Sequence, residues 1–507
     1  VDPVMLEIFN KLFMSIAEQM GFVLQKTAYS VNIKERLDFS CALFNQQGEL
    51  IANAPHIPVH LGSMGEAVQA LLKVEIIQQG EVYLLNSPYQ GGTHLPDITV
   101  VSPVFSDDEQ LLFFVASRGH HADVGGITAA SMPAYSQHIS EEGLLSAGLK
   151  IVQNDQFQEQ TVRDWLQSSE YPARNCEQNI ADLQAQIAAN NKGVLELKKM
   201  VAHYSLTTVQ SYMQHVQDNA AETVRRLLPT LTSGSFEQVM DNGAKIVVKI
   251  TINAEKKSAK IDFTGTSSQL NNNFNAPAAV CKAAVLYVFR TLVNDDIPLN
   301  AGCLQPLEII IPDGSMLNPK YPAAVVAGNV ETSQYIVDAL YGALGVLAGS
   351  QGTMNNLTFG NEDYQYYETI CGGAGAGDGF NGCDAVQTHM TNSRITDPEV
   401  LEWRFPVILE QFSIRKNSGG QGKFKGGNGV LRKIKFLSPM IVSILSSHRI
   451  HPPFGLHGGC VGAVGENKVI RFNGEIINLE ACSQVTMQKD DCLQIKTPAG
   501  GGYGMDK

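Results

Sequence analysis

The segment "GGTHLPDITVVSPVF" (residues 91–105) joins two glycines and a His-x-x-Asp pair to an apolar run. The run from residue 98 has the length and the β-branched content of a strand, so the segment predicts a loop that leads into a strand. Pro96 disfavours a helix across the pair, because the residue before a proline avoids helical backbone angles. A turn at this point lets the side chains of His94 and Asp97 converge at the mouth of the strand.

The flanking sequence contains further short apolar runs around glycine-containing turns. The segment "DFSCALFNQQGELIANA" (38–54) predicts a hairpin, and "VYLLN" (82–86) and "LLFFVAS" (111–117) predict additional strands. The region from about residue 35 to 125 is therefore expected to be strand-rich, with its unusual residues in the connecting loops.

Helical patterns lie on both sides of this region. Asp2 and Pro3 fit an N-cap and a first helical residue, and the apolar spacing that follows predicts a helix to about Gln25. Residues 182–228 form a second helical segment, with an interruption expected near 190–193. Farther along, 244–266 predicts a hairpin and 277–293 a buried helix.

The last third is rich in glycines that lie between strand-like runs, which indicates tight turns and not low complexity. We therefore expect an α+β fold in a mixed multi-domain chain. The expected regions are a strand-rich N-terminal part that carries the site loops (1–170), a helical segment (171–235) and a glycine-rich strand and turn region (236–507).

Composition limits the classes of function. The 507 residues are 44% hydrophobic, and the net charge is -13 without a Lys/Arg-rich block, so nucleic acid and anionic membrane surfaces are not expected partners. No stretch reaches the roughly 18 apolar residues of a membrane span. The nine cysteines contain no CxxC pair, which predicts reduced thiols and a cytoplasmic protein.

Histidines cluster in the strand-rich region. Five of the twelve fall between residues 56 and 121, and they are His56, His60, His94, His120 and His121. Imidazole and carboxylate groups suit Mn, Fe or Zn, and a catalytic centre commonly uses three protein ligands. His94 and Asp97, together with a histidine of "RGHHADVGG" (118–126), would supply such a set. The alternative is a loop pair that only bonds to backbone.

The stretch "APHIPVHLGSM" (54–64) places two of these histidines four residues apart. On a helix they would form a ligand pair, but Pro55 and Pro58 argue against a helix. In an extended chain His56 and His60 would point to the same side. We interpret them as substrate contacts, or as contacts that support the ligands, in preference to ligands.

Glycine-rich segments raise the question of a phosphate loop. In "GGQGKFKGGNG" (419–429), Phe424 stands where the pattern GxxxxGK[ST] requires a hydroxyl. A nucleotide site on this chain is therefore not expected. Cys41 and Cys371 lack a paired base in sequence and are interpreted as buried thiols.

Six segments in order resemble the hydantoinase B family, and the resemblance runs from about residue 4 to 504. The segments are "NIKERLDFSCALF" (32–44), "HIPVHLGSM" (56–64), "NSPYQGGTHLPDITV" (86–100), "SRGHHADVGG" (117–126), "NPKYPAAVVAGNVETSQ" (318–334) and "NSGGQGKFKGGNGVLR" (417–432). The family includes a B component of N-methylhydantoinase, the C-terminal half of 5-oxoprolinase, and subunits of acetone and acetophenone carboxylases.

The resemblance implies a partner, a hydantoinase A-type ATPase subunit that binds ATP and Mg and phosphorylates a carbonyl-type oxygen of the substrate. It also implies a divalent metal site on His94, Asp97 and His120, with His121 as the alternative to His120. For the proton acceptor in the reaction we expect His121 or Asp123.

Two arginines are candidates for holding a phosphate or carboxylate of the substrate through bidentate contacts, Arg36 and Arg118. A structural salt bridge is the alternative for each.

The expected function is therefore that of a B-type subunit of an ATP-dependent cyclic-amide hydrolase, which acts on a small cyclic amide phosphorylated by the partner. A subunit of an ATP-dependent ketone carboxylase and a non-catalytic structural partner of the A-type subunit are the alternatives. The identity of the substrate distinguishes the hydrolase from the carboxylase. ATP consumption with each substrate distinguishes both enzymes from a non-catalytic structural partner.

Overall fold

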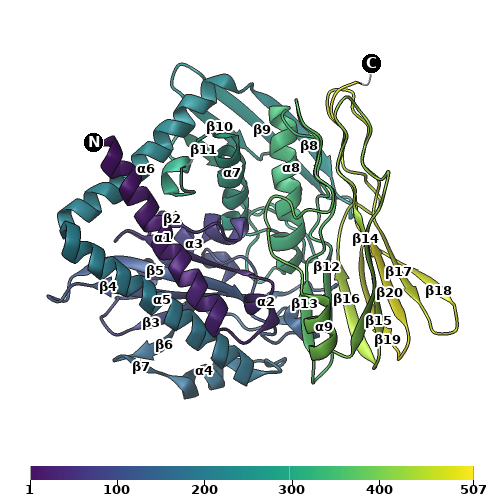
Figure 1. Ribbon diagram of the computed structural model, residues 1–507, viewed down its shortest axis with the longest axis horizontal. Helices are drawn as coiled ribbons and strands as arrows, with labels where there is room; N and C mark the ends of the chain where they lie inside the picture. The colour runs from purple at the N-terminus through teal and green to yellow at the C-terminus, as the bar shows by residue number, and fades with distance from the viewer. Residues whose placement is uncertain (1, 296, 506–507) are drawn as a thin grey trace.

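The computed structural model describes residues 2–295 and 297–505 and has an α+β fold in which helices cover several sheets (Figure 1). The helices are α1 (Pro3–Thr27), α2 (Val31–Lys34), α3 (Pro58–Val74), α4 (Glu159–Leu166), α5 (Cys176–Tyr204), α6 (Leu206–Leu227), α7 (Ala278–Leu292), α8 (Ser333–Leu344) and α9 (Pro398–Arg404). A π-helical turn, Gly328–Thr332, precedes α8 directly.

The strands of the first half are β1 (Phe39–Phe44), β2 (Leu50–Asn53), β3 (Val82–Leu85), β4 (Asp97–Phe105), β5 (Leu111–His120), β6 (Leu149–Gln153), β7 (Gln156–Phe157), β8 (Gly234–Val239), β9 (Lys245–Asn253) and β10 (Ser258–Asp262). Those of the second half are β11 (Leu307–Ile310), β12 (Asn356–Gly360), β13 (Gln365–Glu368), β14 (Val407–Ile414), β15 (Val430–Phe436), β16 (Met440–Leu445), β17 (Glu466–Ile470), β18 (Ile476–Leu479), β19 (Cys482–Met487) and β20 (Cys492–Lys496). The predicted strands and both predicted hairpins of the first half are confirmed.

A seven-stranded antiparallel sheet in the order β2-β1-β5-β4-β3-β6-β7 forms the base of the site. Successive residues of β1 pack into two different cores. Cys41 and Leu43 pack with α1 and α5 on one face of the sheet, and Ala42 and Phe44 pack with α3 on the other face. Successive residues of a strand point to opposite faces. Both faces are covered, so polar side chains on β4 and β5 are held away from water.

Two long helices, α1 and α5, cover the first face of the sheet. The Asp2 carboxylate accepts from the Val4 amide, as an N-cap does, and the helix then runs to Thr27. The interruption expected near 190–193 is wrong, because α5 continues to Tyr204. Gly193 lets α5 approach α1 closely, since a Cβ there would lie 2.5 Å from Met20 Sδ.

The expectation that residues 56–60 are extended is also wrong. Pro58 is the first residue of α3, a position at which its missing amide hydrogen removes no helical bond. His60 therefore lies in the first turn of a helix and His56 lies before it. The two side chains point to different surroundings.

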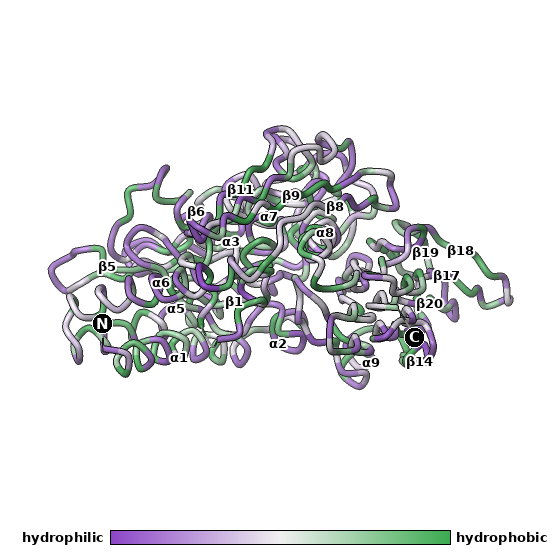
Figure 2. Tube along the Cα trace, turned by 90° about the horizontal axis from the view of Figure 1, so that it is seen from above, coloured by the Kyte–Doolittle hydropathy of each residue, from purple (hydrophilic) through white to green (hydrophobic). Residues whose placement is uncertain are grey.

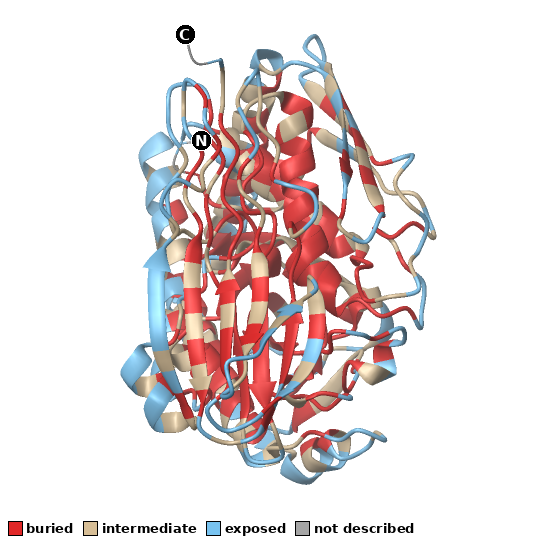
Figure 3. Ribbon diagram, turned by 90° about the vertical axis from the view of Figure 1, so that its right-hand side faces the viewer, coloured by how far each residue is buried: buried red, intermediate tan, exposed pale blue. Residues whose placement is uncertain are grey.

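The second half contains a four-stranded sheet, β11-β10-β9-β8, which shares a core with α7 and α8. Two further sheets, β13-β12-β16-β19 and β14-β15-β20-β17-β18, pack face to face around a third core. Figure 2 shows these C-terminal strands toward one end of the long axis and α1 toward the other. Figure 3 shows the buried residues along the inner strands and helices.

Within the residues that the structure describes, no helix combines the length and the apolar composition that crossing a bilayer requires.

Candidate metal centre

The predicted ligands lie where two neighbouring strands meet. Asp97 is the first residue of β4, His120 is the last residue of β5, and the two are direct partners across the antiparallel ladder. His94 belongs to the loop that enters β4. The backbone register therefore brings a carboxylate and two imidazoles to one point.

His94, Asp97 and His120 form a compact group. One ligand atom from each lies within 4.8 Å of the other two, and each residue is at most 2% exposed. The Asp97 Oδ1 atom lies 3.1 Å from His94 Nε2 and 3.1 Å from His120 Nδ1. His94 Nδ1 and His120 Nε2 are buried without a hydrogen-bond partner in the part of the chain described, and His94 Nε2 lies against Asp97 Oδ1 without forming a hydrogen bond. Such orphaned nitrogens suit an additional cation.

The second carboxylate oxygen of Asp97 is held by donors from three segments. Asp97 Oδ2 accepts from Thr93 Oγ1 at 2.6 Å and from Asn329 Nδ2 at 3.2 Å, and His60 Nε2 lies 3.1 Å away. His60 Nδ1 in turn lies 3.3 Å from Ser40 Oγ. These contacts fix the carboxylate so that Oδ1 faces the two histidines.

The electrostatics keep Asp97 ionised. Burial alone would raise the pKa of Asp97, but the adjacent His94 and His60 and the hydrogen bond to His120 hold it well below its usual value. Burial lowers the pKa of His120 in spite of its contact with Asp97. A carboxylate beside a neutral imidazole is the protonation state that a metal ligand needs.

The structure does not bring His121 to this group. His121 follows the end of β5 and is directed toward α5, where Nε2 contacts Gln186 Oε1 at 2.9 Å and Nδ1 contacts Asn179 Nδ2 at 3.1 Å. Burial lowers its pKa. His120 and not His121 joins His94 and Asp97, because adjacent residues of an extended chain point to opposite sides.

Asp123 lies outside the group as well. Its carboxylate binds Arg174 at 3.0 Å and accepts from the amides of Gly125 and Ala130, so it holds a loop together. Burial raises its pKa despite these donors. The structure gives Asp123 no contact with the ligands.

Both candidate arginines are fully buried and donate within the protein, although Arg36 Nε has no hydrogen-bond partner among the described residues. Arg36 donates to the Tyr367 carbonyl at 2.9 Å and lies 4.7 Å from the centre of the Tyr367 ring. Arg118 donates to Thr99 Oγ1 at 2.7 Å and to Ser63 Oγ at 2.6 Å. Neither side chain lines the cavity at the ligands. Their contacts support the residues around the site.

A small cavity adjoins the ligands and includes residues that the sequence did not indicate. Its volume is about 10 Å³, which is roughly the space that one water molecule needs. Asp38, Asn329 and Tyr367 line it, and the Tyr367 ring stacks on His120 at 4.5 Å. Asp38 and Asn329 lie within quoted motifs of the sequence and Tyr367 does not, but no local pattern links Asn329 or Tyr367 to the histidines.

Gly91 fixes the loop that carries His94. Its φ is +84°, and a Cβ there would lie 2.2 Å from the Ala67 amide nitrogen of α3. We expect Gly91→Ala to lower the free energy of unfolding by about 2–4 kcal/mol, from the left-handed backbone and the clash together. Denaturant unfolding measures this. Gly243→Ala is the matched control, because Gly243 has φ +81° with nothing within 4 Å, and equal losses in both variants would contradict the steric argument.

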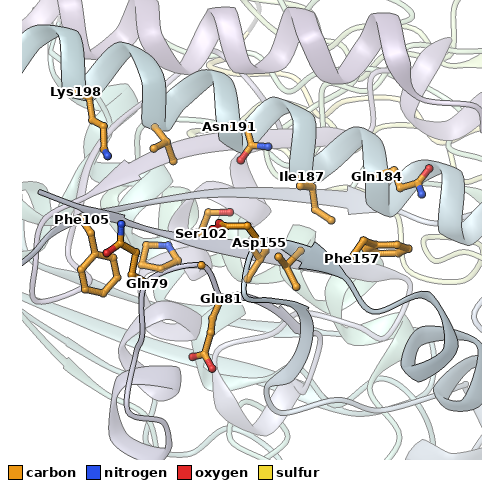
Figure 4. A pocket seen from close by; sticks show the side chains of 15 residues that line it. Gln79, Glu81, Ser102, Phe105, Asp155, Phe157, Gln184, Ile187, Asn191 and Lys198 are labelled. Atoms are coloured by element: carbon orange, nitrogen blue, oxygen red, sulfur yellow. The ribbon is translucent and has the colours of Figure 1, made fainter. Parts of the chain in front are cut away.

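A pocket of about 390 Å³ lies away from the ligands, between α5 and the sheet, where Gln184, Asn191 and Lys198 of α5 face Ser102 and Phe105 of β4 (Figure 4). Asp97 begins β4, so Ser102 is roughly 16 Å farther along the strand. This pocket contains none of the predicted site residues.

The chain belongs to the Hydantoinase B/oxoprolinase family, whose model matches residues 2–506. A 5-oxoprolinase of Dictyostelium discoideum is 50% identical over 520 residues, which cover 99% of this chain and 40% of that protein. The chain thus spans less than half the length of this relative.

Two solved structures share the fold. An ATP-dependent caprolactamase from Pseudomonas jessenii superposes with a TM-score of 0.87 at 23% identity, covering 100% of this chain and 91% of that one. An acetone carboxylase structure gives a TM-score of 0.89 at 18% identity, covering 99% of this chain and 76% of that one.

Proposed function

We propose that this chain is the B-type component of an ATP-dependent cyclic-amide hydrolase and that His94, Asp97 and His120 hold a divalent metal ion. The observation that carries the proposal is the buried convergence of these three residues in a member of the Hydantoinase B/oxoprolinase family.

The donor set fits such an ion. Two imidazoles and one carboxylate suit Mn, Zn or Fe, and the buried nitrogens without partners are free to act as ligands. When bound, the ion would supply Lewis-acid polarisation of an oxygen of the substrate. The chain itself supplies orientation, because Thr93, His60 and Asn329 hold Asp97 from behind.

The residues that line the cavity suit proton acceptance and the positioning of the His120 ring. Asp38 lines it, and its backbone carbonyl accepts from the His120 amide at 3.0 Å, so we assign to Asp38 the proton-accepting role that the sequence suggested for His121 or Asp123. Tyr367 stacks on His120 and fixes the plane of that ring. The enclosed cavity excludes bulk water, which strengthens every charge interaction within it.

ATP and Mg would bind outside this chain. Its sequence contains no GxxxxGK[ST] segment, and the matched 5-oxoprolinase carries a large amount of sequence beyond the shared part. An A-type ATPase, either as a separate subunit or as part of a longer chain, would phosphorylate the amide oxygen and pass the intermediate on.

The names of the relatives rank the substrates. A relative at 50% identity is called 5-oxoprolinase, so 5-oxoproline comes first and hydantoins follow. A structural relative is named for caprolactam, which is also a cyclic amide, but at 23% identity this likeness supports a shared fold only. Ketone carboxylation is the second candidate, and its support is a fold shared at 18% identity.

The test combines the chain with its A-type ATPase and measures ATP consumption with 5-oxoproline, with hydantoin, and with acetone plus bicarbonate. We expect consumption with a cyclic amide and no ATP binding by this chain alone in calorimetry. ATP use with acetone and bicarbonate only would replace the proposal with the carboxylase. Micromolar ATP binding by the isolated chain would move the nucleotide site onto it.

A further inference from the structure

The cavity at the ligands is too small for any cyclic amide. Its volume of about 10 Å³ accommodates one water or ion, whereas small-molecule pockets usually measure about 300–1,000 Å³. A substrate therefore has to reach the ligands through a wall that opens.

A second, larger pocket lies directly behind one wall. We call it the outer pocket; its volume is about 460 Å³, and Glu18, Gln25, Phe39, His56, Asn392 and Arg394 are among the residues that line it. The cavity at the ligands is called the inner cavity below.

Three chain segments separate the two spaces, and consecutive residues line opposite sides of them. Leu37, His56 and Asn392 face the outer pocket, and their sequence neighbours Asp38, Ile57 and Thr391 face the inner cavity. The dividing wall is therefore one residue thick at each of these three places.

Two hydrogen bonds join the wall segments to each other. The Asn392 side chain donates to the His56 carbonyl at 3.0 Å, and the Val59 amide donates to the Met390 carbonyl at 3.3 Å. The segment around His56 is also tied to β1, because the Ile57 amide donates to Ser40 Oγ at 3.1 Å. Asn392 is exposed, and its bond joins the two outward-facing residues of different segments. Loss of a single exposed bond should raise the population of the open wall.

The outer pocket offers groups that match a lactam. His56 Nδ1 accepts from the Cys41 amide at 3.0 Å, which leaves the ring proton on Nε2 as a donor. Burial lowers the pKa of His56 to about 4, so the ring stays neutral at pH 7. Arg394 is exposed, and within the described residues its guanidinium forms no ion pair, so it can donate to a carboxylate of the ligand.

We propose that the outer pocket is the entry-side binding site for a small lactam that carries a carboxylate, and that the wall of residues 54–57 and 390–392 opens to pass it to the inner cavity. This inference rests on the proposed function for the identity of the ligand, while the access route itself does not depend on metal or turnover.

The experiment measures how fast diethyl pyrocarbonate modifies His94 and His120 in the chain after dialysis against EDTA, with mass spectrometry of the digested protein. Asn392→Ala should speed modification about fivefold, the factor that one lost hydrogen bond represents. Gln25→Trp fills the outer pocket and should slow it. The buried His448 lies outside the wall and provides an internal control, since its rate should not change.

Gln19→Trp is the matched control for Gln25→Trp. Both glutamines belong to α1 and are partly buried, but Gln19 lines a different pocket. Its substitution should leave the rates at His94 and His120 unchanged. Unchanged rates in both Asn392→Ala and Gln25→Trp, or equal slowing by the two tryptophans, would overturn the route.

The same assay tests the ligand. 5-Oxoproline should protect His56 from modification better than the uncharged 2-pyrrolidinone, and Arg394→Gln should weaken protection by 5-oxoproline about tenfold or more. Equal protection by both lactams would overturn the carboxylate assignment. Because the readout needs neither ATP nor metal, it is separate from the substrate panel that tests the proposed function.

Discussion

Asp97→Ala is expected to remove bound metal and substrate turnover together. Asp97 supplies the oxygen that lies 3.1 Å from both His94 and His120, so its loss removes the centre of the group. Loss of residues behind a ligand typically costs 10–100-fold in metal affinity or activity, so loss of the ligand should exceed about 100-fold. Metal analysis of the purified chain and turnover with the ATPase partner measure the two effects.

Variants of the residues behind Asp97 should have smaller effects on metal affinity than loss of Asp97 itself. His60→Gln and Asn329→Ala remove contacts behind Asp97 and should reduce metal affinity by about 10–100-fold while retaining measurable turnover. Thermal unfolding of each variant checks that the fold is intact. Metal content equal to that of the unchanged chain in both Asp97→Ala and His94→Ala would show that the metal, if any, binds elsewhere.

Glu368→Gln should cause a large loss of stability in the C-terminal part of the chain. Glu368 on β13 forms a bidentate pair with Arg432 on β15, at 2.6 and 2.8 Å, and joins the two C-terminal sheets. Both side chains are at most 1% exposed, so the variant leaves a buried guanidinium without its counter-charge. We expect the free energy of unfolding to fall by about 3–5 kcal/mol in urea titrations.

Two further variants test whether the loss of stability comes from the buried charge of Arg432. Glu177→Gln removes the exposed partner of Arg163 and should leave the unfolding midpoint unchanged. Replacing Glu368 and Arg432 together with methionine should recover most of the stability, because no charge then remains buried. A Glu368→Gln midpoint within error of that of Glu177→Gln would contradict the role assigned to the pair.

The sequence alone determined the local elements and the core of the candidate site. Short apolar runs between glycine-containing turns predicted the strands of the first half, and an Asp-Pro start predicted α1, because these signals depend only on neighbouring residues. The His94–Asp97 pair could be found for the same reason, since three residues and a proline turn define it. Its partner had to come from the next strand, and the sequence offered two adjacent histidines there.

Only the tertiary structure decided which side chains meet. The register that pairs Asp97 with His120 turns His121 toward α5, and a shift of one residue would have exchanged them. Pro58 starts α3 and separates His56 from His60, which a local pattern of prolines did not indicate. Asn329 and Tyr367 reach the site from more than 200 residues away in sequence. Such convergence is set by how sheets and helices pack, and no neighbouring residue carries a signal of it.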